Sequence, residues 1–190
     1  MAQLTKAAIM EAFARLLEQL PMDQITVQAI TSGCGISRNT FYYHYGDIYA
    51  LLKALLQRDM DMLLAQRQPG ERARDGLRRL FEYVSTRQRM VSHIYSGVGH
   101  ATLEEYLLET TEPLFMAYLQ DTAEGLSPSA EDLDFICRSF QFMLIGILLS
   151  WVRHGMKGDV ADLLERAERL FFHGTRRLLE ENSVPFVPFS

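Results

Sequence analysis

Side chains that form hydrogen bonds are concentrated between residues 26 and 45 of this chain. In residues 38–45 they greatly outnumber the candidates for a hydrophobic core. A helix of this composition gains little free energy from burial, so we expect its side chains to contact a partner. Guanidinium, amide and hydroxyl groups are the ones that bind bases and phosphates of DNA. The candidate DNA-binding side chains are Thr26, Ser37, Arg38, Asn39, Thr40, Tyr42, Tyr43 and His44.

Two short helices joined by a tight turn would position these side chains. Thr26 is a suitable N-cap for the first helix, and Ser37 for the second. The glycines of Gly33–Gly35 break the chain between them, because glycine permits the positive φ of a sharp turn. Phe41 and Tyr45 are expected to face the core and hold the second helix. This layout is typical of a DNA-reading helix-turn-helix.

Within the second helix the residues differ in their expected roles. Arg38 and Asn39 lie at its start, where Arg can pair with guanine and Asn with adenine. Tyr42 and His44 are better placed for phosphate contacts. The net charge of the chain is −5, and residues 1–46 are neutral overall. We therefore expect hydroxyls, backbone N–H groups and helix N-termini to bind phosphate, with weak non-specific binding.

The segment also has a characteristic pattern of residues, at Thr26, Val27, Ile30, Gly35, Ile36, Ser37, Thr40, Phe41, Tyr42, His44 and Tyr45. This pattern resembles the signature of the TetR family of bacterial transcriptional regulators, and the resemblance covers residues 5–55. Where many family members carry a lysine near the start of the next helix, this chain has Ile48, so one phosphate contact of the family is not expected here.

The resemblance implies a homodimer that binds a near-palindromic double-stranded DNA operator, with its two heads about 34–36 Å apart. It also implies a repressor that a small effector releases, through a shift in the spacing of the heads. Residues 146–179 are similar to a Gram-positive-type subgroup that includes regulators of dihydroxyacetone-kinase operons.

The bulk properties predict a compact cytoplasmic protein. A chain of 190 residues can bury a sizeable core in one or two domains. We find no apolar run long enough to span a bilayer and no signal peptide at the N-terminus. The two cysteines, Cys34 and Cys137, are far apart in sequence and suggest no disulfide framework.

The apolar periodicity predicts an all-α fold of about nine or ten helices. We place a helix-turn-helix head at residues 1–46, an effector-binding and dimerisation body at 47–182, and a C-terminal tail at 183–190. Asp47 is expected to cap a helix that connects head and body. Pro113 lies inside a long helical pattern, so a kink or break is expected there. Residues 90–97 are expected to form a short, apolar, broken segment. The expected helices are 5–20, 26–34, 37–45, 48–65, 71–89, 102–124, 133–152 and 160–179.

The last two predicted helices indicate how the chain assembles. Residues 133–152 are apolar on nearly every face, and a helix of this kind must be covered on all sides. The chain has few elements left to cover it, so a second copy is the expected partner. The predicted dimer-interface residues are Leu149, Val152, Leu163, Ala167, Leu170, Phe171, Gly174 and Leu178.

The body also contains more aromatic and methionine side chains than a minimal core needs. Ordinary packing explains most of them singly, while together they favour an apolar ligand site with a few hydroxyls. The alternative is a ligand-free adaptor or activator whose body binds a partner protein. The predicted ligand-binding residues are Phe81, Tyr95, Tyr106, Phe115, Tyr118, Phe140, Met143 and Trp151.

No enzyme, metal or cofactor chemistry is expected. The histidines lack i,i+4 spacing, and no acidic residue or cysteine completes a ligand set with them. Residues 97–99 are too short for a dinucleotide-binding loop, and we find no nucleophile or paired acids typical of a catalytic cleft. Cys34 is read as a small buried hydrophobe.

Overall fold

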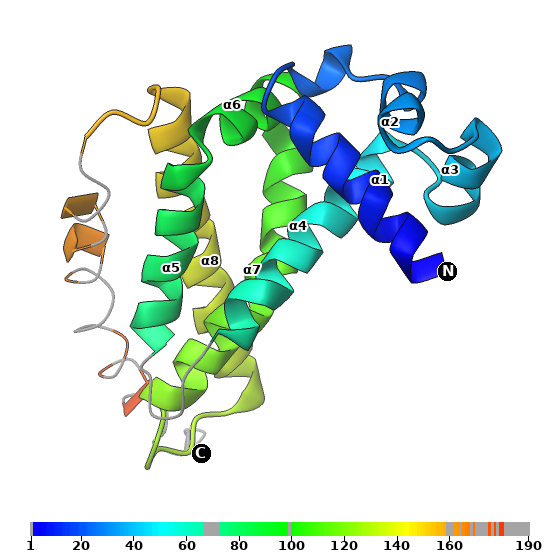
Figure 1. Cartoon of the computed structure of the whole chain (residues 1–190). Coiled ribbons are helices and arrows are strands. Elements are labelled where there is room, and N and C mark those ends of the chain that lie inside the picture. Colours follow the sequence, from blue (N-terminus) through cyan, green and yellow to red (C-terminus); the bar gives the residue numbers. More distant parts are fainter. Residues whose placement is uncertain are drawn as a thin grey trace.

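The computed structural model describes residues 2–66, 73–98, 100–158, 162–163, 165–167, 169, 175, 177 and 179–180. Every regular element within these residues is a helix, which confirms the predicted all-α fold class. Figure 1 shows a small head beside a larger helical body. The elements are α1 (Ala2–Leu17), the 3-10 helix η1 (Met22–Gln24), α2 (Val27–Cys34), α3 (Arg38–His44), α4 (Ile48–Ala65), α5 (Ala73–Thr86), α6 (Gln88–Gly97), α7 (His100–Thr122) and α8 (Ala130–Arg153).

Four helices begin at a side chain that caps them. Thr26, Ser37, Asp47 and Ser129 each accept a hydrogen bond from the backbone N–H three residues later, at 2.7–3.2 Å. Each cap satisfies an N–H that the helix leaves without a partner and contributes about 1 kcal/mol. The first three were predicted as caps from the sequence, and the structure confirms them.

The head is built on a core where α1, α2 and α3 meet. Ile9, Phe13, Ile30 and Phe41 have no exposed surface there. Helix α4 starts in the same core and then runs from the head along the body, as Figure 1 shows. One continuous helix therefore belongs to both the head and the body.

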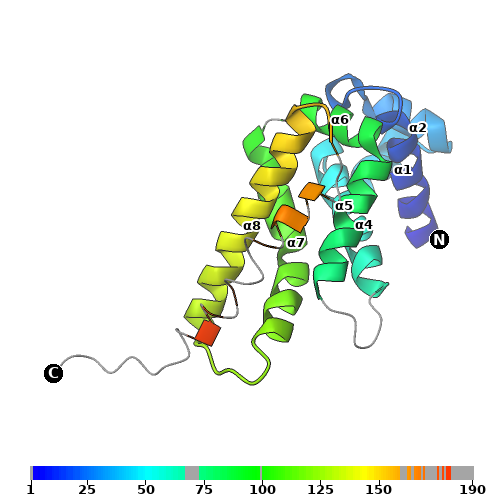
Figure 2. The same cartoon turned by 90° about the vertical axis from the view of Figure 1, so that its left-hand side faces the viewer.

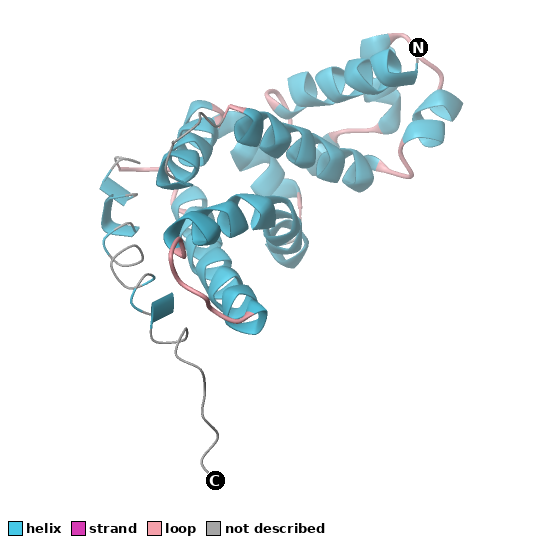
Figure 3. Ribbon diagram, turned by 90° about the horizontal axis from the view of Figure 1, so that it is seen from below, coloured by secondary structure: helices cyan, strands magenta, loops and turns pink. Residues whose placement is uncertain are grey.

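The body consists mainly of α5, α7 and α8 packed beside the far half of α4 (Figure 2). Its core is apolar and includes Phe81, Phe115 and Leu119, all almost fully buried. One polar side chain joins two of these helices, because the Gln141 amide on α8 donates to the Leu108 carbonyl on α7 at 2.8 Å. Figure 3 shows the helices from below.

Helix α6 forms the second junction between the body and the head. Its residues Met90 and Ile94 belong to the same buried cluster as the core of the head. Its last residue, Gly97, lies so close to η1 that a Cβ there would be 2.7 Å from the backbone nitrogen of Asp23. Only glycine allows this approach, which fixes the end of α6 against η1.

Three expectations about the helices need correction. Residues 90–97, expected as a broken segment, belong to the continuous helix α6. Helix α1 begins and ends earlier than the predicted span 5–20. Helix α7 continues through Pro113 without a break, since proline removes a single backbone bond and the flanking turns remain packed. The expectation that the chain alone leaves this apolar helix partly uncovered agrees with the described residues, among which three large apolar side chains of α8 are exposed: Phe135, Phe142 and Met143. The structure describes only scattered residues of the predicted helix 160–179, and the tail 183–190 lies outside them.

Helix α8 is long and apolar enough to cross a membrane by length and composition alone. Within its most apolar window 56% is buried inside the fold, as in the core helix of a soluble protein.

Candidate nucleic-acid interface and internal cavity

The turn between α2 and α3 has the geometry that the sequence predicted. Helix α2 ends at Gly35, whose φ of 68° is left-handed, and its N–H donates to the Thr31 carbonyl. Ser37 then caps α3, and its hydroxyl also lies 2.9 Å from the Thr40 hydroxyl. A hydroxyl that accepts a cap hydrogen bond still has an O–H to donate. The start of α3 therefore offers hydroxyl and backbone donors for a phosphate.

Helix α3 turns most of its polar side chains outward. Tyr42 is 54% exposed and Tyr43 is 83% exposed, while Arg38 and Asn39 are exposed at its first turn. His44 is half-buried, and its ring meets that of Tyr43 edge-on, with centroids 5.1 Å apart. This exposed polar face is what the composition of the segment led us to expect.

The inner face of α3 holds the helix against the head. Phe41 is fully buried and Tyr45 is 7% exposed, as predicted from the sequence. Burial raises the pKa of the Tyr45 phenol, so the group is neutral. The two aromatic rings pack with centroids 6.0 Å apart. Helix α3 is therefore anchored on one side and free to face a partner on the other.

Sequence reasoning missed the role of Gln28. Its side-chain oxygen on α2 accepts a hydrogen bond from the Arg38 guanidinium on α3 at 2.6 Å. The contact spans the turn and orients Arg38 before any partner is bound. Nothing in the spacing of the motif marks this residue, because a polar side chain at an exposed helix position usually faces solvent.

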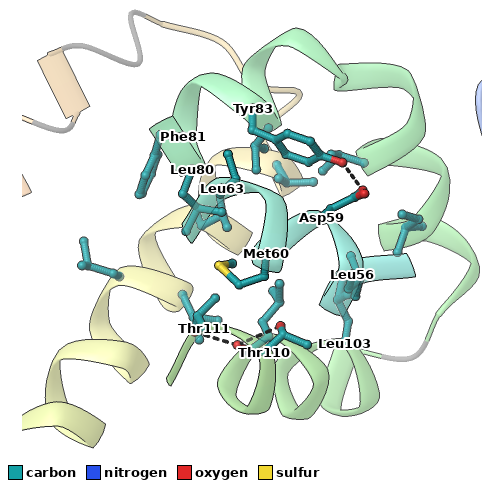
Figure 4. Close-up of a pocket in the computed structure, with 18 of the residues that line it drawn as sticks. Leu56, Asp59, Met60, Leu63, Leu80, Phe81, Tyr83, Leu103, Thr110 and Thr111 are labelled. Atoms are coloured by element: carbon teal, nitrogen blue, oxygen red, sulfur yellow. Dashed lines mark hydrogen bonds between the residues drawn. The ribbon is translucent and has the colours of Figure 1, made fainter. Parts of the chain in front are cut away.

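The body contains an apolar cavity of about 90 Å³. Side chains of five helices, α4 to α8, surround it, and Figure 4 shows most of them. Two of these helices, α4 and α6, are those that also pack into the head. The lining residues are Leu56, Asp59, Met60, Leu63, Leu80, Phe81, Tyr83, Val84, Met90, Val91, Ile94, Leu103, Leu107, Thr110, Thr111, Phe115, Leu144, Ile145, Leu148 and Val152.

A polar pair, in which Asp59 is buried and Tyr83 is half-buried, lies at the edge of this apolar cavity (Figure 4). The Tyr83 hydroxyl on α5 donates to the Asp59 carboxylate on α4. The Arg58 guanidinium also binds this carboxylate, at 3.0 Å and 2.8 Å. Burial, and then the hydrogen bond to Asp59, raise the pKa of Tyr83, so its hydroxyl stays protonated. The Arg87 guanidinium lies 3.8 Å from the centre of the Tyr83 ring and fixes its orientation.

Of the predicted ligand residues, Phe81 and Phe115 line the cavity. The other six lie elsewhere. Tyr118 and Phe140 pack against each other in the core of the body, with ring centroids 6.3 Å apart. Trp151 is also buried there, where its indole N–H donates to a backbone carbonyl at 3.2 Å.

The remaining three predicted ligand residues are less buried. Tyr106 lies under the Lys53 ammonium, 5.9 Å from the ring centre. Tyr95 is half-buried and packs against the cores of both head and body. Met143 is 39% exposed on the outer face of α8. The number of aromatic residues does not distinguish the side chains that line the cavity from those of the packed core, because both sets are apolar.

The polar lining residues were missed, although the sequence contains a signal for one of them. Asp59 falls inside the apolar stripe of α4, four residues after Leu55 and four before Leu63. A charged residue on the buried face of a helix needs a partner, which makes it a candidate for a functional site.

The predicted dimer residues are only partly within the described chain. Leu149 and Val152 were expected to face outward, but both are buried inside the single chain, because α8 packs this side against α6 and the cavity. Ala167 is buried and Leu163 half-buried against the core of the body. Leu170, Phe171, Gly174 and Leu178 lie outside the described residues.

A capped helix-turn-helix joined to a helical body with a cavity defines a class of DNA-binding regulators. Comparison with family models gives two matches, to bacterial regulatory proteins of the tetR family over residues 9–55 and to a transcriptional regulator C-terminal region over residues 71–173. The chain belongs to the TetR family of bacterial transcriptional regulators, whose members are DNA-binding regulators and not enzymes.

Solved structures share the fold at low sequence identity. The dihydroxyacetone kinase operon activator DhaS superposes with a TM-score of 0.71 at 21% identity, over 93% of this chain and 98% of DhaS. A tetR-family regulator from Streptomyces coelicolor has a TM-score of 0.62 at 19% identity, over 98% of this chain and 93% of that regulator. FadR from Thermus thermophilus, a repressor solved in complex with lauroyl-CoA, superposes with a TM-score of 0.64 at 22% identity. The match covers 89% of this chain and 94% of FadR. No curated protein gave a significant sequence match.

Proposed function

We propose that this chain is a cytoplasmic repressor that binds a near-palindromic operator as a homodimer and is released by a small apolar effector. The observation that carries the proposal is the placement of the cavity. Two of the helices that line it, α4 and α6, also pack into the core of the DNA-binding head. A ligand that changes the position of either helix therefore changes the position of α3.

Sequence-specific contact would come from the start of α3. Arg38 is exposed and already oriented by Gln28, so it loses little side-chain entropy when it pairs with a guanine. Asn39 beside it can read an adenine. The hydroxyls of Thr26, Ser37 and Tyr42 can donate to phosphates that flank these bases.

The proposed dimer would use the outer face of α8. Phe135 is 72% exposed and Phe142 is 53% exposed, at positions seven residues apart on one face of the helix. Met143 is adjacent and also exposed. Exposed large apolar residues that form a stripe on one helix mark an interaction surface. The second copy of this chain is the proposed occupant, as the family usually dimerises through its final helices.

An activator or adaptor is the second candidate. DhaS, the relative with a TM-score of 0.71, is described as an operon activator. The exposed apolar stripe of α8 could then bind a partner protein. In that case the purified chain would bind its operator with the same affinity whether or not ligands of the cavity are present.

The test starts from the purified full chain and a random DNA library. Rounds of selection should enrich a near-palindrome, and fluorescence anisotropy on that sequence should show one dimer bound per site. A thermal-shift screen of small apolar compounds should then give ligands that raise the melting temperature and weaken operator binding, because coupling between two sites is reciprocal. Enrichment of no sequence would reject the DNA-reading role. Ligands that bind without changing operator affinity would reject effector control.

A further inference from the structure

The described side chains that line the cavity have no hydrogen-bond donor left for a ligand. Three of them carry an O–H, and each O–H is already used. The Tyr83 hydroxyl donates to Asp59. The Thr110 and Thr111 hydroxyls each donate to a backbone carbonyl of α7, both at 2.7 Å. The other lining side chains are apolar apart from Asp59, which only accepts while ionised.

Acceptor positions, in contrast, remain. A carboxylate can accept about four hydrogen bonds. The Asp59 carboxylate receives two from Arg58 on Oδ1 and one from Tyr83 on Oδ2, so Oδ2 keeps one position. The Thr110 oxygen also keeps its lone pairs, whereas the Thr111 oxygen already accepts from Gln141 at 3.3 Å. Asp59 and Thr110 both line the cavity, whose surface is otherwise almost entirely apolar, and Figure 4 shows Met60 between them.

Burial gives these acceptors a large effect on binding. Asp59 is 5% exposed and Thr110 is 1% exposed. In an apolar site a donor that reaches such an acceptor gains a hydrogen bond, while another acceptor placed there remains unpaired. An anionic ligand would also meet the negative charge of Asp59 at short range. Two described cations lie nearby, and both are engaged: Arg58 pairs with Asp59, and Arg87 lies against the Tyr83 ring.

We propose that the cavity binds a compact apolar molecule with one hydrogen-bond donor, a hydroxyl or an amine, and that it excludes carboxylates. Asp59 is the anchor and Thr110 the second acceptor. A volume of about 90 Å³ suits a ligand of about one ring, since a cavity of about 150 Å³ admits benzene and the Met60 side chain can adapt. The inference rests on the proposed function and names the ligand class of its effector site.

The test uses four probes that share one ring: benzyl alcohol, benzylamine, toluene and benzoate. Dissociation constants for the full chain are measured from the shifts of methionine methyl signals in NMR titrations. Benzyl alcohol or benzylamine should bind about two- to tenfold more tightly than toluene, because a net hydrogen bond adds that much. Benzoate should show no saturable binding. Binding of benzoate as tight as that of benzyl alcohol, or tightest binding of toluene, would overturn the proposal.

Variants assign the selectivity to Asp59. In Asp59→Asn the charge is gone and the amide supplies a donor, so the discrimination against benzoate should disappear. The matched control is Asp61→Asn, an exposed residue on the same helix that should leave all four affinities unchanged. A folded Asp59→Asn that still rejects benzoate would contradict the assignment.

If Asp59→Asn does not fold, the variant Tyr83→Phe tests the role of Asp59 in ligand binding instead. It frees the position that Tyr83 occupies on Asp59, so the affinity for benzylamine should rise, and an unchanged or lower affinity would overturn the proposal.

For the second acceptor, Thr110→Val should reduce the preference for benzyl alcohol over toluene. Thr122→Val is its control, since the Thr122 hydroxyl also bonds its own helix but lies outside the cavity.

Operator binding separates this inference from the proposed function. If benzyl alcohol binds with the expected selectivity and operator affinity does not change, the ligand class holds and effector control fails. If benzoate releases the operator as well as benzyl alcohol does, effector control holds and the ligand class is wrong.

Discussion

The imidazole Nδ1 of His93 on α6 lies 2.7 Å from the carbonyl oxygen of Leu17, the last residue of α1. With the proton on Nδ1, the ring donates to a carbonyl that has no partner within its own helix. The residues of α6 on either side, Met90 and Ile94, face both the cavity and the head. One hydrogen bond therefore joins the helix that would sense a ligand to the first helix of the head.

Replacement of His93 by Ala should weaken this connection. We expect a loss of about 1 kcal/mol of unfolding free energy and a smaller change in operator affinity when a cavity ligand binds. His154→Ala is the control, since its ring binds the carbonyl of Ser150 in its own helix at the same distance. Chemical denaturation and operator anisotropy measure both effects. An undiminished ligand response in a folded His93→Ala would show that coupling bypasses this contact.

Substitution of Gly97 by Ala tests the second contact between α6 and the head. The new Cβ would lie 2.7–2.8 Å from two backbone nitrogens of η1, and backbone cannot rotate away as a side chain can. We expect a loss of about 1–3 kcal/mol, typical of overpacking. Gly33→Ala is the comparison, because its Cβ would make an ordinary contact of 3.5 Å. Equal melting temperatures for the two variants would show that η1 moves without cost.

For the DNA interface, Arg38→Ala should cost about 1–3 kcal/mol on the specific operator and relax the preference at one base position. Gln28→Ala should produce part of this loss, because it removes the 2.6 Å contact that orients the guanidinium. Tyr42→Phe should weaken binding evenly across sequences, as a lost phosphate contact does. Anisotropy on a set of single-base operator variants distinguishes these patterns. If Arg38→Ala ranks the operator variants by affinity in the same order as the native chain, Arg38 does not read a base.

The helix-turn-helix could be predicted from the sequence because its determinants are local. Capping hydroxyls, a left-handed glycine and two inward aromatic residues act within about twenty residues, and spacing alone reveals them. Thr26, Ser37 and Gly35 have the backbone conformations that these roles require. Phe41 and Tyr45 are buried as expected.

The cavity could not be predicted in this way, because side chains of five helices meet in it and no short segment encodes it. Phe140 and Phe115 are alike in type, yet only Phe115 lines the cavity. The same holds for α8. Its sequence is apolar on every side, so it does not show which face packs inward and which faces outward. Leu149 points inward and Phe142 outward, a difference that follows from how α8 packs on α6 and α7.

The exposed face of α8 gives a prediction about assembly. Phe135→Glu with Phe142→Glu should convert the proposed dimer to monomers in sedimentation velocity, because two buried, unpaired carboxylates strongly disfavour the interface. The folded chain should be retained, since both side chains are exposed within one copy. Gln120→Glu, at an exposed site on α7, should leave the dimer intact. A double variant that remains a dimer would place the interface elsewhere.

The buried thiol of Cys137 predicts how stability changes in alkaline solution. Burial, followed by the nearby Glu112 carboxylate, raises its pKa from 9.0 to about 11. Between these two values the unfolded chain has lost the thiol proton and the folded chain keeps it. The stabilisation is complete below pH 9, and it falls as pH rises toward 11. Tyr83 and Tyr45 also have raised pKa values, so the contribution of Cys137 must be isolated by substitution.

Cys137→Ala should therefore flatten the decline of unfolding free energy between pH 9 and 11, although the variant is less stable at neutral pH because of the cavity it leaves. Cys34→Ala is the matched control. The pKa of Cys34 is also raised by burial, but this thiol is only half-buried, so its substitution should change the slope less. Urea denaturation at half-unit steps of pH gives the slopes. Equal slopes for the native chain and Cys137→Ala would mean that the thiol ionises in the folded state as readily as in the unfolded one.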